Sequence, residues 1–170
     1  AHADPAADYP AVMLAVDAEI LMQGPDGERI VSAADFFQGL FTVDLSADEI
    51  ITAIRFSPTR TASYAKLYQR ASRFAIVGVA AALDVADGAV RSARVGLTGA
   101  GSHAVRLTAV EEALVGRAAT PEAVAETAEG AGAGLEDVND DIHASEAYRR
   151  AMIPVFTKRA LVGAVARVPA

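Results

Sequence analysis

The sequence predicts an α+β fold, with a three-stranded antiparallel sheet followed by three helices in its C-terminal part. Stretches of strand length at residues 63–70, 75–85 and 90–98 follow one another, and an Asp-Gly turn at residues 86–89 joins the last two. Beyond residue 105, apolar residues recur at helical spacing instead. Strands grouped before helices are typical of an α+β domain.

The N-terminal part is expected to form two short helices and three strands. Asp8 is a candidate N-cap, with Pro10 in the first turn of the helix that it begins. Ser32 can cap the second helix, expected over residues 33–40. The three strands are expected over residues 19–23, 28–31 and 49–56, the first two joined by an Asp-Gly hairpin turn.

In the C-terminal part, the strand at 75–85 is apolar at nearly every position. We therefore expect it to be central in its sheet and covered on both faces. A helix is expected over residues 105–115. Thr120-Pro121 and Ser145-Glu146 carry the start signals of two more, the last running over residues 146–165.

A chain of 170 residues is long enough for one domain, or for one domain and part of another. Pro58 lies in a connector that should end the strand before it. The sequence therefore predicts two domains, over residues 1–57 and 58–170.

The composition excludes several classes of function. The formal net charge of −7 argues against binding to nucleic acid or to an anionic membrane surface. The chain has no cysteine, so it forms no disulfide, performs no thiol catalysis and ligates no iron–sulfur cluster. Its longest apolar stretch, residues 74–83, is shorter than a membrane span. A reducing, cytoplasmic location is expected.

Candidate metal and catalytic residues have simpler explanations. The three histidines, His2, His103 and His143, lack the spacing of metal ligands, so no metal site is expected. Ser145 is better explained as a helix cap than as a nucleophile. The glycines of residues 96–101 do not match a nucleotide-binding loop, and a turn that requires positive φ explains them better. No catalytic residue is expected in this chain.

Three segments together carry a resemblance to a known family. Residues 3–10 (Ala-Asp-Pro-Ala-Ala-Asp-Tyr-Pro), 63–80 (with Tyr64, Lys66 and Arg-Ala-Ser-Arg-Phe at 70–74) and 145–150 (Ser-Glu-Ala-Tyr-Arg-Arg) occur in order and with suitable spacing. They resemble the flavin-binding medium subunits of molybdenum hydroxylases such as aerobic carbon monoxide dehydrogenase. The resemblance implies the remnant of a flavin-binding α+β domain, followed by a complete C-terminal α+β domain.

The resemblance also implies residues that contact FAD. It places Asp8, and Asp4 beside it, near the ribityl chain, Ile51 and Phe74 against the flavin ring, and Lys66 near the pyrimidine edge of the ring. By residue chemistry alone, Asp8 would be a cap, Phe74 a core residue and Lys66 a solvated lysine. The chain departs from the family pattern at Arg73, where an acidic residue often stands.

The implied function belongs to an assembly. A molybdenum–pterin large subunit oxidises the substrate, a small subunit with 2Fe-2S clusters relays the electrons, and FAD passes them to an external acceptor. The assembly is expected to be a dimer of heterotrimers.

Most pyrophosphate contacts of the family lie in a segment that would precede residue 1. We therefore expect this polypeptide alone to hold FAD weakly or not at all. The alternative is a non-catalytic docking module that does not retain FAD. A stand-alone nucleotide-binding enzyme is less favoured, because no catalytic group accompanies residues 96–101.

Overall fold

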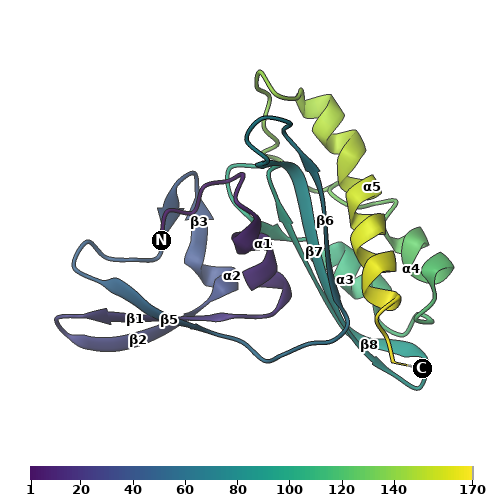
Figure 1. Cartoon of the computed structure of the whole chain (residues 1–170), viewed down its shortest axis with the longest axis horizontal. Coiled ribbons are helices and arrows are strands. Elements are labelled where there is room, and N and C mark those ends of the chain that lie inside the picture. The colour runs from purple at the N-terminus through teal and green to yellow at the C-terminus, as the bar shows by residue number, and fades with distance from the viewer. Residues whose placement is uncertain (170) are drawn as a thin grey trace.

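The computed structural model describes residues 1–169 and confirms the α+β class (Figure 1). The helices are α1 (Asp8–Ala15), α2 (Ala33–Phe36), α3 (Thr108–Leu114), α4 (Pro121–Thr127) and α5 (Glu146–Val165). The strands are β1 (Glu19–Gly24), β2 (Gly27–Ser32), β3 (Phe37–Gly39), β4 (Thr42–Val43), β5 (Ile50–Arg55), β6 (Ala62–Tyr68), β7 (Ala75–Ala86), β8 (Ala89–Thr98) and β9 (Val105–Arg106).

The C-terminal sheet has the order β6-β7-β8-β9 and is antiparallel throughout. The sheet therefore has four strands and not the three that were predicted, because the short strand β9 was missed. Val105 and Arg106, expected to begin a helix, pair instead with Leu97 and Gly96, and α3 starts only at Thr108. Two residues of strand are too few to show any alternation in a sequence.

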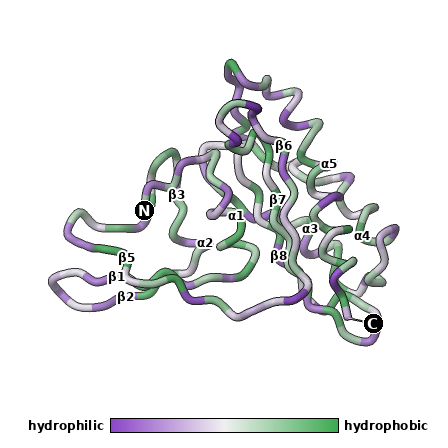
Figure 2. The backbone as a smooth tube through the Cα atoms, in the orientation of Figure 1, coloured by the Kyte–Doolittle hydropathy of each residue, from purple (hydrophilic) through white to green (hydrophobic). Residues whose placement is uncertain are grey.

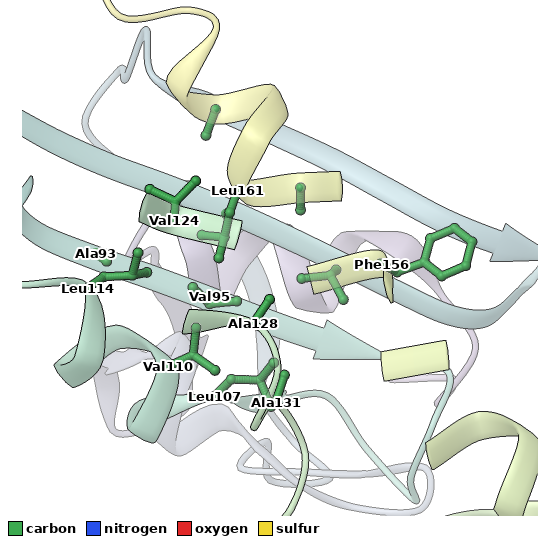
Figure 3. Packing of buried hydrophobic residues seen from close by; sticks show 14 of the residues in the cluster. Ala93, Val95, Leu107, Val110, Leu114, Val124, Ala128, Ala131, Phe156 and Leu161 are labelled. Carbon is green, nitrogen blue, oxygen red and sulfur yellow. The ribbon is translucent and has the colours of Figure 1, made fainter. Parts of the chain in front are cut away.

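Strand β7 is covered on both faces, as predicted (Figure 1). Helices α3, α4 and α5 pack on one face and form the main core, which Figure 3 shows in part. In that core Val95 of β8 meets Val110 of α3, Val124 of α4 and Leu161 of α5. Figure 2 shows mainly hydrophobic residues along β7, and hydrophilic ones at the tip of the β1–β2 hairpin.

The opposite face of the same sheet is covered by α1, which belongs to the N-terminal part of the sequence. Small residues make the contact, because Ala11 and Ala15 of α1 pack against Ala80 of β7. Gly96 lies so close to α1 that a Cβ atom there would stand 2.2 Å from the carbonyl oxygen of Ala11. The backbone of α1 therefore rests directly on β8.

The N-terminal part also forms a separate three-stranded sheet with the order β2-β1-β5, as Figure 1 shows. The helix expected over residues 33–40 ends at Phe36, so its second half was wrong. Phe37 leaves the helical region and pairs with Val43 in the β3–β4 ribbon. Phe36 is buried at 1% exposure and meets the Phe37 ring edge-on at 5.3 Å. Both aromatic rings therefore pack inward, while Leu40, at the end of the range expected to be helical, is exposed.

Three predicted caps are confirmed. The side chains of Ser32, Thr120 and Ser145 each accept a hydrogen bond from a backbone N–H in the first turn of α2, α4 and α5, respectively. Within residues 1–169, no helix is both long enough and apolar enough to cross a membrane.

Candidate functional site

A cavity of about 370 Å³ lies between the start of the chain and the N-terminal sheet. Three of the five residues expected to contact FAD, namely Asp4, Ile51 and Phe74, line it together. The rest of the lining is mainly apolar and comes from the N-terminal segment, α1, β1, α2, β3 and β5. These residues are Ala1, His2, Ala3, Ala7, Tyr9, Pro10, Met13, Ile20, Phe36, Phe37 and Ile54.

A β-bulge in β5 shapes one wall of this cavity. Met22 of β1 pairs with Ile51, but its neighbour Leu21 pairs with Ala53, so Thr52 is an extra residue in the ladder. In a regular strand, residues three apart point to opposite faces. The bulge instead brings Ile51 and Ile54 to the same cavity.

Ile50, the neighbour of Ile51 in this strand, does not line the cavity and is 65% exposed. Ile54 was missed by the sequence analysis. No residue pattern announces the bulge, because Thr52 is an ordinary strand residue that donates its hydroxyl to the carbonyl oxygen of Leu21 at 3.2 Å. Only the pairing of β5 with β1 shows it.

Phe74 forms another wall, at the end of the connection between β6 and β7. The loop is closed by a hydrogen bond from the N–H of Gln69 to the carbonyl oxygen of Phe74 at 2.9 Å. Arg73 adopts a φ of 66°, which is uncommon for a residue with a side chain. Its guanidinium lies over the ring of Tyr68, 4.5 Å from the centroid. The loop thus presents Phe74 to the cavity, while the guanidinium of Arg73 packs on Tyr68.

Asp8 and Lys66 lie beside the cavity rather than in its lining. The Oδ2 of Asp8 accepts a hydrogen bond from the Nζ of Lys66 at 2.6 Å, and its Oδ1 accepts one from the hydroxyl of Tyr64 at 2.6 Å. The Nζ of Lys66 also donates to the carbonyl oxygen of Arg73 at 2.8 Å. Ala7 and Tyr9, the neighbours of Asp8, do line the cavity.

The prediction that Asp8 caps α1 was wrong. Ala7 occupies the cap position without a side-chain hydrogen bond, and Asp8 is the first helical residue. Its carboxylate is turned instead toward β6, where it meets one hydroxyl and one ammonium group. Burial, and then the hydrogen bond to Asp8, raise the pKa of Tyr64 well above its ordinary value. The phenol therefore stays protonated and holds the carboxylate in place.

Asp4 organises the segment that leads into α1. Its Oδ1 accepts a hydrogen bond from the N–H of Ala6 at 2.9 Å, and its own carbonyl oxygen accepts one from Ala7 at 3.0 Å. Tyr9 and Pro10, which the sequence analysis did not select, line the cavity as well. Their position next to Asp8 is the one signal that pointed to them.

Residues 1–169 contain no group of three or more His, Cys, Asp or Glu side chains that could hold a metal ion. Within residues 96–101, Gly99 has a φ of +82°, in agreement with the predicted turn.

Comparison with known proteins gives two family matches that follow each other along the chain. Residues 1–59 match the FAD-binding domain in molybdopterin dehydrogenase. Residues 62–164 match the CO dehydrogenase flavoprotein C-terminal domain.

Individual relatives agree with these matches. The nicotine 6-hydroxylase medium subunit of Paenarthrobacter nicotinovorans is 34% identical, over 98% of this chain and 59% of the relative. The carbon monoxide dehydrogenase medium chain of Hydrogenophaga pseudoflava is also 34% identical, over the same shares. The chain thus spans 59% of the length of these relatives.

Solved structures are similar over almost the whole chain. Carbon monoxide dehydrogenase from Hydrogenophaga pseudoflava superposes with a TM-score of 0.89 at 36% identity, covering 98% of this chain and 58% of that one. Quinoline 2-oxidoreductase from Pseudomonas putida 86 gives a TM-score of 0.86 at 30% identity, with the same coverage.

Proposed function

The chain belongs to the CO dehydrogenase flavoprotein C-terminal domain family, and on that premise we propose that it is part of the FAD-binding medium subunit of a molybdenum hydroxylase. The subunit would receive electrons from iron–sulfur clusters and pass them through FAD to an external acceptor. The relatives named as medium chains or medium subunits support this proposal. We propose two domains, over residues 1–57 and 58–170, that build the flavin site together.

The partners follow from the same proposal. The chain has no cysteine, so the 2Fe-2S clusters would belong to a small subunit and the molybdenum–pterin to a large one. The assembly would be a dimer of such heterotrimers. The cytoplasm would be its location.

The observation that carries the proposal is the cavity lined by Asp4, Ile51, Ile54 and Phe74. Its volume of about 370 Å³ lies in the range of small-molecule sites, which are mostly apolar with a few polar groups. Two isoleucines and an aromatic ring fit a flat ring system and exclude water from it. When bound, FAD supplies a redox centre between the clusters and the acceptor.

The polar residues fit the edges of such a ligand. A carboxylate offers about four acceptor positions, and Asp8 uses two of them for Tyr64 and Lys66. It therefore retains capacity to accept hydroxyl protons from a ribityl chain. The Nζ of Lys66 lies on the carbonyl oxygen of Arg73, the residue before Phe74, and its positive charge there would stabilise negative charge on a reduced flavin.

The test is a titration of the isotope-labelled chain with FAD, followed through its amide NMR signals. FAD should be added up to about 1 mM, because a Kd of that size corresponds to only about 4 kcal/mol of binding free energy. We expect shifts at Asp4, Ala7, Ile51 and Phe74. Riboflavin should give the same pattern, because these residues are proposed to contact the ring and the ribityl chain.

Amide signals that shift only for residues lining another cavity would contradict the proposal. A second cavity of about 210 Å³, between α3 and residues 130–135, provides that comparison within the same spectra. The absence of any shift with riboflavin as well as with FAD would favour the docking-module alternative, because riboflavin has no pyrophosphate that must be held.

A further inference from the structure

A buried arginine on α5 binds the ends of two strands. The side chain of Arg149 is 3% exposed. Its Nη1 donates to the carbonyl oxygens of Ile76 and Gly99, each at 2.7 Å, and its Nη2 donates to the Oδ2 of Asp141 at 2.6 Å. A guanidinium stays protonated in proteins, and a buried charge requires such acceptors. Arg149 thus fixes the start of β7 and the end of β8 relative to each other.

Both strand ends are bonded in turn to the N-terminal segment. The N–H of Gly99 donates to the carbonyl oxygen of Pro5 at 2.8 Å, and the N–H of Ala75 donates to that of Ala6 at 3.1 Å. A side chain at Gly99 would collide with the carbonyl oxygen of Ala75, at 2.6 Å from its Cβ. The three segments therefore meet at one place, around the smaller cavity that Pro5, Ala75 and Gly99 line.

Two residues that line the candidate flavin cavity are the sequence neighbours of residues that make these hydrogen bonds. Asp4 precedes Pro5, and Phe74 precedes Ala75, and both line the cavity. A smaller cavity of about 160 Å³ is also lined by Phe74, and Arg149 lines that one. Phe74 is thus shared by the flavin cavity and the space beside the arginine.

We propose that Arg149 is a positioning residue for the flavin cavity. Its hydrogen bonds fix the backbone next to Asp4 and Phe74, although the Arg149 side chain does not line the cavity itself. This inference rests on the proposed function, because the cavity is taken to be the flavin site.

The adjacent residue provides a matched control. Arg150, on the same helix, donates to the Oε1 of Glu146 at 2.7 Å and to the carbonyl oxygen of Leu135 at 2.9 Å. It therefore also joins a carboxylate and a backbone carbonyl, but Leu135 follows the glycine-rich residues 130–134 and lines neither cavity that Phe74 lines. Loss of either arginine should destabilise the fold, whereas only Arg149 should affect the cavity.

The experiment compares Arg149→Met with Arg150→Met at a temperature where both are folded. Amide hydrogen exchange is measured without flavin, and FAD is then titrated by NMR. We expect the amides of Ala75 and Gly99 to exchange about tenfold faster or more in Arg149→Met, the size expected for losing hydrogen bonds to a charged group. FAD binding should weaken by about tenfold in the same variant. Arg150→Met should keep wild-type values for both.

Unchanged exchange at Ala75 and Gly99 in Arg149→Met would overturn the inference, and so would equal changes in Arg150→Met. If Arg149→Met does not fold, Arg149→Lys replaces it, because a lysine keeps the charge but lacks the planar fork that bridges two carbonyls. The two proposals remain separable. A wild-type chain that shows no FAD-induced shift counts against the flavin site, whereas the exchange comparison concerns Arg149 alone.

Discussion

The Nζ of Lys66 lies 2.6 Å from the Oδ2 of Asp8, although 58 positions separate the two residues in the sequence. This ion pair joins β6 to the first turn of α1. Only 22% of the Lys66 side chain and 41% of the Asp8 side chain are exposed. The pair is therefore partly screened by solvent, and its contribution to stability should be modest.

We expect Lys66→Met to lower the free energy of unfolding by about 1 kcal/mol, because a half-exposed ion pair is lost while the stem of the side chain remains. Urea denaturation measures this change. Lys158→Met, at an exposed lysine of α5, is the control and should stay within about 0.5 kcal/mol of wild type. Equal effects of the two substitutions would show that the pair with Asp8 contributes nothing.

Gly96→Ala should destabilise the chain by about 1–3 kcal/mol, the usual cost of overpacking a core. The added Cβ would stand 2.2 Å from the carbonyl oxygen of Ala11, and a backbone atom cannot rotate away. Gly130→Ala is the matched control, because no atom lies within 4 Å of its Cβ position. Thermal unfolding of the two variants makes the comparison. A Gly96→Ala variant as stable as Gly130→Ala would mean that α1 does not rest on β8.

The ion pair between Glu49 and Arg29 should make stability depend on pH in the acidic range. The hydrogen bond from Arg29, and then the one from the N–H of Ser46, lower the pKa of Glu49 from 4.5 to about 2. The pair therefore stabilises the fold fully above pH 4.5, and its contribution is lost as the pH falls toward 2.

Urea denaturation of wild type and Glu49→Gln, repeated across this pH window, checks the prediction. The stability of the variant should fall less between pH 4.5 and pH 2, because the glutamine does not titrate. Parallel curves for the two proteins would contradict it.

The bulge at Thr52 predicts opposite outcomes for two nearby isoleucines. Ile54→Ser should weaken FAD binding by about tenfold, since an apolar contact worth about 1.5–3 kcal/mol is removed from the cavity. Ile50→Ser should leave the affinity within about twofold, because Ile50 is exposed and does not line the cavity. An NMR titration with FAD measures both. If Ile50→Ser were the weaker binder, Ile50 and not Ile54 would face the ligand.

Local signals in the sequence predicted much of the fold. Ser32, Thr120 and Ser145 were identified as caps because a cap depends only on the first turn that follows it. Strand β7 was placed correctly because its apolar run is long and continuous. Such features need no knowledge of distant contacts.

What the sequence could not predict depends on pairing between distant segments. Ile54 enters the cavity because of a bulge that exists only in the register between β5 and β1. Asp8 is not a cap because Tyr64 and Lys66 attract its carboxylate. Arg149 lies in the segment 145–150 that carries the family resemblance, but its burial could not be predicted, since a buried arginine looks like a surface arginine until the carbonyls around it are known.

Because α1 packs on the C-terminal sheet, cutting the connector between the two parts of the chain should not separate them. Residues 57–60 are exposed and lie outside any helix or strand, so a protease could reach them. The halves would still be joined by α1 on β8 and by the hydroxyl of Thr98, which lies within hydrogen-bond distance of the carbonyl oxygens of Pro5 and Ala7 and can donate to either. A nicked chain should therefore migrate as one particle and melt in a single transition, like two fragments that complement each other.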